Sequence, residues 1–278
     1  MTVATLASPC VDIESSLFKL YRSYFDRAEK KRRWSLTEDI PWSDCNTNLD
    51  PAVADLVETF CLVEMHLPDY VANAMRAFRA SRACSWFYAN WGYEESKHSL
   101  ALADWLLRSG ARTESQMADL ECNVFQREWN LPHDNHLGML VYAMVQELAT
   151  WLNYRNLRRH AVGQNGDPAL DVLLRYVSVD ERAHFDFFRH CVQLYLDHDR
   201  EATVEQLRRV LSNFAMPAIY DLADSRRRIE QIRRLQIFDE EQYFREVYMP
   251  VLESLGVNRR EIRDRVPIKK SAVDAVAR

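Results

Sequence analysis

Apolar residues recur along most of the chain in long segments, and these segments begin and end at residues that favour helix termini. Asp50-Pro51 and Asp167-Pro168 each combine an N-capping aspartate with a proline suited to the first helical position. Thr113 and Gln116 match a capping box, and it begins a shorter helix that ends before Pro132. The pattern predicts an all-α fold, with further helices over about 12–30, 51–79, 82–109, 134–162, 168–198, 202–234 and 240–254.

Prolines and glycines are expected to shape these helices. Pro68 has no N–H group to bond the carbonyl of Glu64, four residues earlier, so a kink is predicted at Glu64. Pro217 is expected to interrupt the 202–234 helix, and Gly256 to end the last one. The segment 34–42 is interpreted as an extended connector, and residues 266–278 as a flexible tail without a strong apolar stripe.

Two Glu-x-x-His segments carry the chemistry of this sequence, Glu95 to His98 and Glu181 to His184. On a helix, positions i and i+3 lie on one face, about 5–6 Å apart between Cβ atoms, so both side chains can reach one metal ion. One such pair is a weak signal, because helices are rich in solvated glutamates. Two pairs on long helices are typical of a di-iron or di-manganese carboxylate bundle, which also needs a lone glutamate from each of two other helices.

Glu64 and Glu147 fit that requirement. The interval from Glu147 to Glu181 is 34 residues, with a turn signal near its midpoint, and that from Glu64 to Glu95 is 31 residues. A chain that descends one helix and climbs the next therefore brings both carboxylates of each pair to a similar depth. Either lone glutamate alone would be interpreted as solvated or paired with arginine. The six positions together favour a metal site, because an unpaired carboxylate on an apolar face costs several kcal/mol.

No linker rich in Gly, Ser or Pro divides the chain, so residues 1–278 are predicted to form one domain. Its parts are an N-terminal helix and connector over 1–50, four ligand-bearing helices over 51–198, and C-terminal helices over 199–265 before the tail.

Composition and net charge argue against two classes of protein, nucleic-acid-binding proteins and membrane-spanning proteins. A net charge of −5 argues against general nucleic-acid binding, and no apolar run approaches the length of a membrane span. The six cysteines are scattered without a CxxC motif, which is typical of a reducing compartment. With no signal-peptide pattern at the start of the sequence, we expect a cytoplasmic protein.

The sequence resembles soluble acyl-[acyl-carrier-protein] desaturases from about Trp34 to Asp221. Five segments carry the resemblance: Glu64-Met65-His66-Leu67-Pro68-Asp69-Tyr70, Glu94-Glu95-Ser96-Lys97-His98, Gln146-Glu147-Leu148-Ala149-Thr150, Asp180-Glu181-Arg182-Ala183-His184 and Met216-Pro217-Ala218. The resemblance implies a ferritin-like four-helix bundle core with additional helices. It also implies two Fe ions (Fe2+/Fe3+), held by Glu64, Glu95, His98, Glu147, Glu181 and His184.

The resemblance also assigns roles around this site. Thr150 matches a hydroxyl that assists O₂ activation, although a packing hydroxyl bonded to the backbone is an equal alternative. Asp180 would orient a ligand imidazole. Trp34 matches a tryptophan that carries electrons inward, with Trp42 as a rival. Four further residues are interpreted as core or as the lining of an acyl channel: Met144, Trp151, Phe187 and Phe188.

Members of the family are homodimers that receive electrons from ferredoxin and act on acyl chains tethered to an acyl carrier protein. Docking of that carrier could use Arg76, Arg79 and Arg82, which fall at helical spacing, or the cluster Arg226-Arg227-Arg228; either set could equally be a solvated face. The remaining histidines are expected to be structural, among them His66, His133, His136, His160 and His190.

The predicted function is that of an O₂-dependent di-iron oxidase that introduces a double bond into a carrier-bound acyl chain. Two alternatives stay open. The same frame could serve a hydroxylase or N-oxygenase of a specialised substrate, although the extra histidine ligand common in N-oxygenases is not evident. A ferritin-like iron-binding protein with no organic substrate would share the metal ligands.

Overall fold

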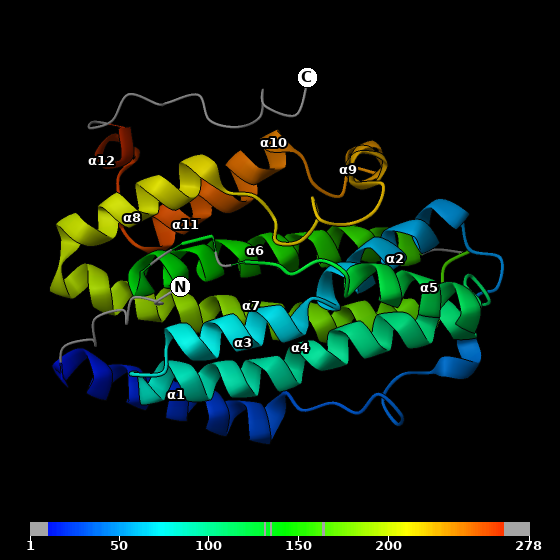
Figure 1. Cartoon of the computed structure of the whole chain (residues 1–278), viewed down its shortest axis with the longest axis horizontal. Coiled ribbons are helices and arrows are strands. Elements are labelled where there is room, and N and C mark those ends of the chain that lie inside the picture. The colour runs from blue at the N-terminus through cyan, green and yellow to red at the C-terminus, as the bar shows by residue number, and fades with distance from the viewer. Residues whose placement is uncertain (1–10, 131, 134, 163–164, 264–278) are drawn as a thin grey trace.

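The computed structural model describes residues 11–130, 132–133, 135–162 and 165–263, so the predicted tail over 266–278 lies outside the described residues. Every regular element within those ranges is a helix, which confirms the all-α prediction (Figure 1). Four helices form the core: α2 (Pro51–Glu64), α4 (Arg82–Arg108), α6 (His136–Ala161) and α7 (Pro168–His198). Helix α2 packs against α4 and α6, and α7 packs against α4 and along most of α6.

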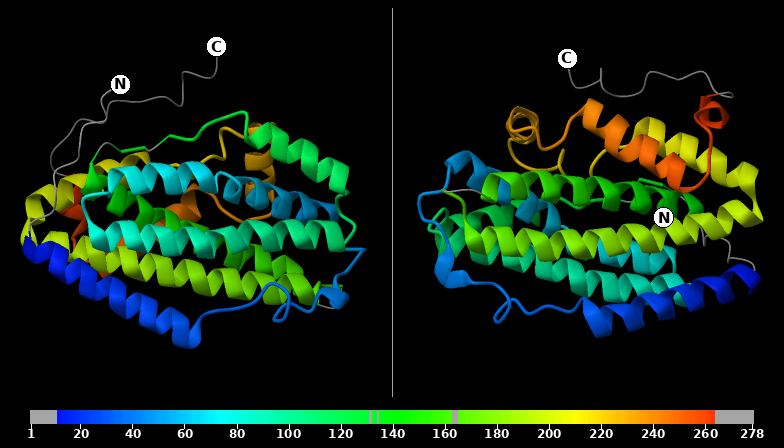
Figure 2. Two further views of the ribbon diagram at one scale, coloured as in Figure 1. Left: turned by 60° about the horizontal axis from the view of Figure 1, so that its bottom comes forward. Right: turned by 180° about the vertical axis from the view of Figure 1, so that it is seen from behind.

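The other helices cover opposite sides of this bundle (Figures 1 and 2). Helix α1 (Val11–Lys31) lies along α4 and α7 on one side, and α3 (Leu67–Ala77) packs against α4. The 3₁₀ turn η1 (Trp42–Asp44) and α5 (Glu114–Val124) lie at one end. The second side carries α8 (Arg200–Asn213), α9 (Ser225–Arg234), α10 (Glu240–Gln242), the π-helical η2 (Tyr243–Tyr248), α11 (Met249–Ser254) and α12 (Arg259–Arg263).

The predicted caps explain where these helices begin. The side chain of Asp50 accepts a hydrogen bond from the backbone N–H of Ala52, and Asp167 accepts one from Leu170. Thr113 and Gln116 form both bonds of the capping box. Each cap satisfies a backbone donor that the first turn of a helix leaves unpaired, and is worth about 1 kcal/mol. The capping predictions at these positions are confirmed.

Both proline interruptions are larger than predicted. Near Pro68 the chain breaks completely: α2 ends at Glu64, and Leu67 begins α3. The hydroxyl of Tyr70 donates to the carbonyl of Val63 at 3.0 Å and so satisfies one acceptor that the break exposes. Around Pro217 the non-helical segment extends from 214 to 224, because the backbone adopts left-handed conformations at Ala218 (φ 54°) and Asp224 (φ 56°).

Two apolar clusters fill the bundle on either side of a buried polar layer. The first contains Phe87 and Leu140 together with Met144, Phe187 and Phe188, which settles their role as core residues. The second contains Leu102, Trp105 and Leu157. Burial of a side chain of this size contributes about 1.5–3 kcal/mol, so these clusters supply the stability that keeps charged groups buried between them. That polar layer is where the candidate site lies.

Candidate metal centre

All six predicted ligands are buried in the layer between the apolar clusters. Their donor atoms fall into two groups in which the atoms lie within 4.8 Å of one another. Glu64 and His98 belong to one group and Glu147 and His184 to the other, while Glu95 and Glu181 belong to both. The arrangement therefore offers two adjacent metal positions that share two carboxylates.

The two histidines present the same nitrogen to the shared carboxylates. Nδ1 of His98 lies 3.0 Å from Oε2 of Glu95 and 3.3 Å from Oε1 of Glu181. Nδ1 of His184 lies 3.0 Å from Oε1 of Glu95. The Nε2 atom of each ring points away from the donor groups, where it meets a different carboxylate.

These outer carboxylates pair crosswise between α4 and α7. Oδ2 of Asp180 lies 3.3 Å from Nε2 of His98, and Oε2 of Glu94 lies 2.9 Å from Nε2 of His184. Asp180 thus contacts a ligand imidazole, the kind of group that the resemblance expects it to orient. Glu94 was missed, although a signal existed: an acidic residue directly precedes the glutamate of both Glu-x-x-His segments. A carboxylate on Nε2 fixes the ring and leaves Nδ1 free for a metal ion.

Arg32 joins the two outer carboxylates. Its guanidinium group forms ion pairs with Asp180 and with Glu94, the latter at 2.9 Å, and it donates to the hydroxyl of Tyr24 at 2.6 Å. The Tyr24 hydroxyl in turn donates to Glu94. Arg32 lies just beyond the helix predicted over 12–30, and nothing in the local sequence indicates that this end of α1 enters the bundle.

Aromatic donors hold the two lone glutamates. The hydroxyl of Tyr154 donates to Oε1 of Glu64 at 2.5 Å, and the indole N–H of Trp91 donates to Oε1 of Glu147 at 3.0 Å. Four other buried atoms of this centre lie close to one another but make no hydrogen bond of acceptable geometry: Oε1 of Glu95, Oε1 of Glu181, Oε2 of Glu147 and Nδ1 of His184. Unpaired buried polar atoms are costly, and metal ligation would satisfy all four, so the residues fit a two-metal site.

The shifted pKa values of the ligand side chains also favour a metal site. Burial, and then the neighbouring carboxylates, raise the pKa of Glu64 and of Glu147 well above the usual range. Burial alone would lower the pKa of His98, but Glu95 and the other carboxylates around it hold that pKa well above its usual value. The pKa of His184 is raised in the same environment, against the effect of burial, by Tyr24 and the carboxylates. Without metal, protons must therefore compensate the clustered negative charge, and divalent cations can replace them.

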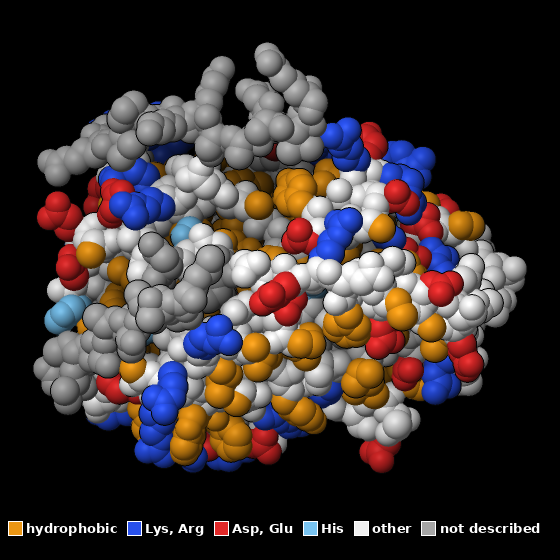
Figure 3. All heavy atoms as spheres, viewed as in Figure 1, with side chains coloured by type: hydrophobic (Ala, Val, Ile, Leu, Met, Phe, Trp, Pro, Cys, Tyr) orange, Lys and Arg blue, Asp and Glu red, His pale blue; other side chains and the backbone are white. Residues whose placement is uncertain are grey.

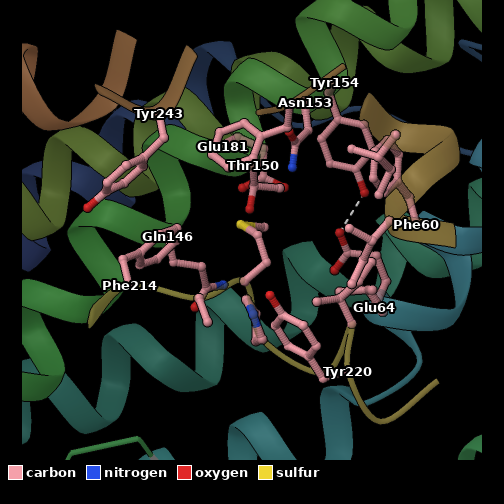
Figure 4. A pocket seen from close by; sticks show the side chains of 18 of the residues that line it. Phe60, Glu64, Gln146, Thr150, Asn153, Tyr154, Glu181, Phe214, Tyr220 and Tyr243 are labelled. Carbon is pink, nitrogen blue, oxygen red and sulfur yellow. Dashed lines mark hydrogen bonds between the residues drawn. The ribbon is translucent and has the colours of Figure 1, made fainter. Parts of the chain in front are cut away.

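A cavity of about 210 Å³ reaches the centre from the side of α9 and η2 (Figure 4). Glu64, Glu95, Glu181 and Thr150 lie on its wall. The remaining wall is mainly apolar and includes Phe60, Val63, Phe214, Met216, Ile219, Ile232 and Phe238. The Thr150 side chain lies on the cavity wall (Figure 4), and its hydroxyl makes no hydrogen bond to the backbone or to another side chain within the described residues. Trp151 faces a different groove, against Arg155 and Arg182, and does not line this cavity.

Trp34 rather than Trp42 lies at the centre. The indole N–H of Trp34 donates to Oδ2 of Asp180 at 2.7 Å, and its ring stacks on Tyr176 with centroids 5.3 Å apart. The indole N–H of Trp42 instead donates to the backbone carbonyl of Leu36. A bonded path therefore runs from Trp34 through Asp180 to His98.

Neither of the two basic patches predicted to dock the carrier protein is present as a continuous exposed surface. Arg76, Arg79 and Arg82 do not share one helix, because α3 ends at Ala77 and α4 begins at Arg82. Arg228 is buried, with an ion pair to Glu58 at 2.6 Å, so it cannot contact a partner. The structure instead places five arginines around a groove of about 800 Å³ between α6 and α7: Arg155, Arg158, Arg159, Arg175 and Arg182.

The remaining histidines stay outside both donor groups, as predicted. Ring nitrogens of His66, His136 and His160 lie within hydrogen-bonding distance of the backbone carbonyls of Leu62, Ala77 and Leu235. These contacts tie loops and helix ends together.

A family model described as fatty acid desaturase matches residues 42–275. The chain belongs to this family. Acyl-[acyl-carrier-protein] desaturases are among its relatives, which confirms the resemblance noted from the four ligand segments. DesA1 of Mycobacterium tuberculosis, named as such a desaturase, is 26% identical over 251 residues, 82% of this chain and 72% of the relative. Chloroplastic acyl-[acyl-carrier-protein] desaturase 3 of Oryza sativa is 30% identical over 142 residues, 49% of this chain and 35% of the relative.

Solved structures agree on the fold of this desaturase family member. DesA2 of Mycobacterium tuberculosis, described as an acyl-ACP desaturase, superposes with a TM-score of 0.67 at 16% identity, covering 88% of this chain and 95% of that one. A variant R2-like ligand-binding oxidase with a Mn/Fe cofactor superposes with a TM-score of 0.54 at 16% identity. The match covers 90% of this chain and 97% of that one. The predicted ferritin-like bundle is thus confirmed. Within the described residues, no helix is long and apolar enough to cross a membrane.

Proposed function

We propose that this protein is an O₂-dependent di-iron oxidase that introduces a double bond into an acyl chain tethered to an acyl carrier protein. The observation that carries the proposal is the junction of the two donor groups with a mainly apolar cavity. Two Fe ions bound by Glu64, Glu95, His98, Glu147, Glu181 and His184 would supply the activation of O₂. Iron storage would need no such cavity, and desaturation of a hydrocarbon chain does.

The cavity walls would hold the acyl chain and exclude water. Phe60, Phe214 and Met216 offer apolar contacts to methylene groups, while Glu64 and Glu181 mark the polar end where the reaction takes place. Dry walls also limit the loss of oxidising equivalents to solvent. The chain is thereby oriented with two neighbouring carbons at the metal centre.

Polar side chains around the centre would each hold a proton or a ring in place. Asp180 and Glu94 accept from the Nε2–H groups of His98 and His184, so that Nδ1 of each ring remains a metal ligand. Thr150 lies one helical turn after Glu147 with its hydroxyl free in the cavity, where it can donate a proton during O₂ activation.

A ferredoxin-like electron donor is proposed to dock on the arginine-lined groove between α6 and α7. Acidic electron carriers are attracted by such clustered positive charge. One of these arginines, Arg175, lies over the ring of Tyr176, which stacks on Trp34. The groove therefore borders the path through Trp34 and Asp180 to His98.

The carrier protein is proposed to dock over α9, because this helix borders the mouth of the cavity. Ile229, Ile232 and Arg233 line the cavity, and Arg227 and Arg234 are exposed on the same helix. An acidic carrier at this position would place the tethered chain at the opening.

The deciding experiment is mass spectrometry of a carrier-bound acyl chain after turnover with iron, O₂ and a reductant. Loss of two hydrogens supports desaturation, whereas gain of one oxygen or an unchanged chain overturns the proposal. His98→Ala is the matched control, since it should bind less than two irons per chain and give no product.

A further inference from the structure

The side-chain amide of Asn153 lies on the wall of the cavity at the metal centre (Figure 4). The residue is 5% exposed, and its Oδ1 atom is buried without a hydrogen-bond partner. Its Nδ2 atom donates to no group within the described residues. Buried amides are ordinarily paired, so an unpaired one that faces a cavity indicates a ligand with matching polar atoms.

Other buried polar groups nearby show the usual pairing. Asn156, on the same helix, is also buried, but its Nδ2 donates to the backbone carbonyl of Ile237 at 2.8 Å. The hydroxyl of Tyr243, on the cavity wall, donates to the backbone carbonyl of Leu211 at 2.8 Å. The unpaired amide of Asn153 is therefore not explained by a general lack of partners in this part of the molecule.

Asn153 extends a polar stripe along α6. Gln146, Thr150 and Asn153 stand at positions i, i+4 and i+7, so they share one helical face over about 10 Å, and all three line the cavity. Gln146 and Thr150 belong to a segment that resembles acyl-[acyl-carrier-protein] desaturases, whereas Asn153 lies outside the five segments that carry the resemblance. The shared motif therefore accounts for the first two residues but not for Asn153.

The rest of the cavity wall is mainly apolar. Phe60, Met216 and Ile232 can contact methylene groups. Figure 3 shows hydrophobic side chains in a hollow of the surface below α10, and Glu240 of α10 also lines the cavity. An unsubstituted acyl chain would fit the apolar wall, but it would exclude water from the amide of Asn153 without giving that amide a partner. A chain with a polar substituent on the side of α6 would match both walls.

We propose that the acyl chain on which this protein acts bears a hydroxyl or secondary amide group that hydrogen-bonds to Asn153. Either group can donate to Oδ1 and accept from Nδ2. Asn153 follows Thr150 by three residues, a spacing that places their Cβ atoms about 5–6 Å apart, so the substituent lies within a few carbons of those held at the metal centre. The inference rests on the proposed function, because it takes a carrier-bound acyl chain as the substrate.

The first experiment measures binding to the full chain without metal, so it needs no turnover. The probes are decanoyl-pantetheine and the same thioester with a hydroxyl or a secondary amide at successive positions of the chain. Calorimetric titration should show that at least one substituted probe binds about 10–100-fold more tightly than the plain chain, the usual effect of pairing a buried polar group. The hydroxyl and amide series distinguish the two substituents. Equal or weaker binding of every substituted probe would overturn the proposal.

Asn153→Leu replaces the amide with an apolar side chain of similar size. This variant should bind the preferred substituted probe about 10–100-fold more weakly and the plain chain at least as tightly as the wild type does. Ile232→Leu is the matched control, because it changes the shape of the apolar wall without changing its polarity, and it should alter both affinities alike. If Asn153→Leu keeps the preference of the wild type, another group recognises the substituent and the proposal is wrong.

Thermal unfolding of the metal-free protein separates a ligand-binding amide from a structural one. Asn153→Leu should raise Tm by about 2–4 °C, because it removes an unpaired buried amide on which no other group depends. Asn156→Leu should lower Tm, because it leaves the carbonyl of Ile237 without its donor. A lower Tm for Asn153→Leu would show that Asn153 supports the fold, and would overturn the proposal.

Product analysis distinguishes failure of this inference from failure of the proposed function. Plain and substituted chains are each supplied on the carrier protein, and their products are weighed by mass spectrometry. A substituted chain that binds preferentially but loses no hydrogens would overturn desaturation and leave the recognition by Asn153 intact. A plain chain that loses two hydrogens with a kcat/KM equal to or above that of every substituted chain would overturn this inference alone.

Discussion

Oε2 of Glu94 lies 2.9 Å from Nε2 of His184, a histidine of the other Glu-x-x-His segment. Asp180 makes the reciprocal contact with His98. Each acidic residue therefore holds the imidazole carried by the opposite helix, so the contacts lock α4 and α7 together at the depth of the metal centre.

Glu94→Gln should reduce metal affinity by about 10–100-fold, the usual cost of losing a carboxylate behind a ligand histidine. The measurement is a competition titration with a chromophoric chelator. Glu241→Gln serves as the control, because Glu241 pairs with Arg245 on the surface and contacts no ligand. Equal affinity of the Glu94 variant and the wild type would show that this contact does not position His184.

Metal affinity should rise with pH. In the metal-free protein the pKa values of Glu64, Glu147, His98 and His184 are all raised, so these groups hold protons that ligation must displace. The apo form binds more protons than the metal-bound form, and low pH therefore favours the apo form. The affinity should increase by about tenfold per pH unit for each proton displaced, and level off above the raised pKa values. Titrations at several pH values test this, and an affinity that is flat or falls with pH would contradict it.

Arg32→Gln should lower the free energy of unfolding of the metal-free protein by about 3–5 kcal/mol, because it leaves Asp180 and Glu94 buried with less compensating charge. Urea unfolding measures the change. The control Arg22→Gln removes an exposed pair with Asp26 and should cost only about 0–1 kcal/mol. If both variants lose the same small amount, Arg32 is not needed to keep the outer carboxylates buried.

Thr150→Val should keep both metal ions but form several-fold less product per O₂ consumed, because it removes the hydroxyl that faces the cavity. Simultaneous measurement of O₂ uptake and product gives this ratio. Thr203→Val is the control, since the Thr203 hydroxyl donates to the backbone carbonyl of Asp199 away from the centre. Wild-type coupling in the Thr150 variant would return this residue to a packing role.

Reversal of the exposed charges on α9, by Arg227→Glu with Arg234→Glu, should raise the KM for carrier-bound substrate several-fold while iron content is unchanged. Exposed charges act mainly on association, so the difference from wild type should shrink as salt is added. Arg76→Glu with Arg79→Glu is the matched control, because these residues lie outside the lining of the cavity. An equal effect of both pairs would indicate that only net charge matters.

The sequence predicted the two Glu-x-x-His pairs from helical spacing, and Glu64 and Glu147 from the intervals between segments together with the resemblance. It could not predict Arg32, whose role depends on where the end of α1 meets the bundle. The predicted patch of Arg76, Arg79 and Arg82 was wrong for a related reason. Residues at this spacing share a face only if one helix continues through all three, and α3 ends at Ala77.

The break after Glu64 makes the two metal positions inequivalent. Glu64 is the last residue of α2, so its carboxylate lies at the negative end of that helix dipole, whereas Glu147 lies within α6. A negative helix end repels a carboxylate and attracts a cation. The position formed by Glu64 and His98 therefore gains an attraction that the Glu147 position lacks, and we expect it to fill first when metal is titrated into the metal-free protein.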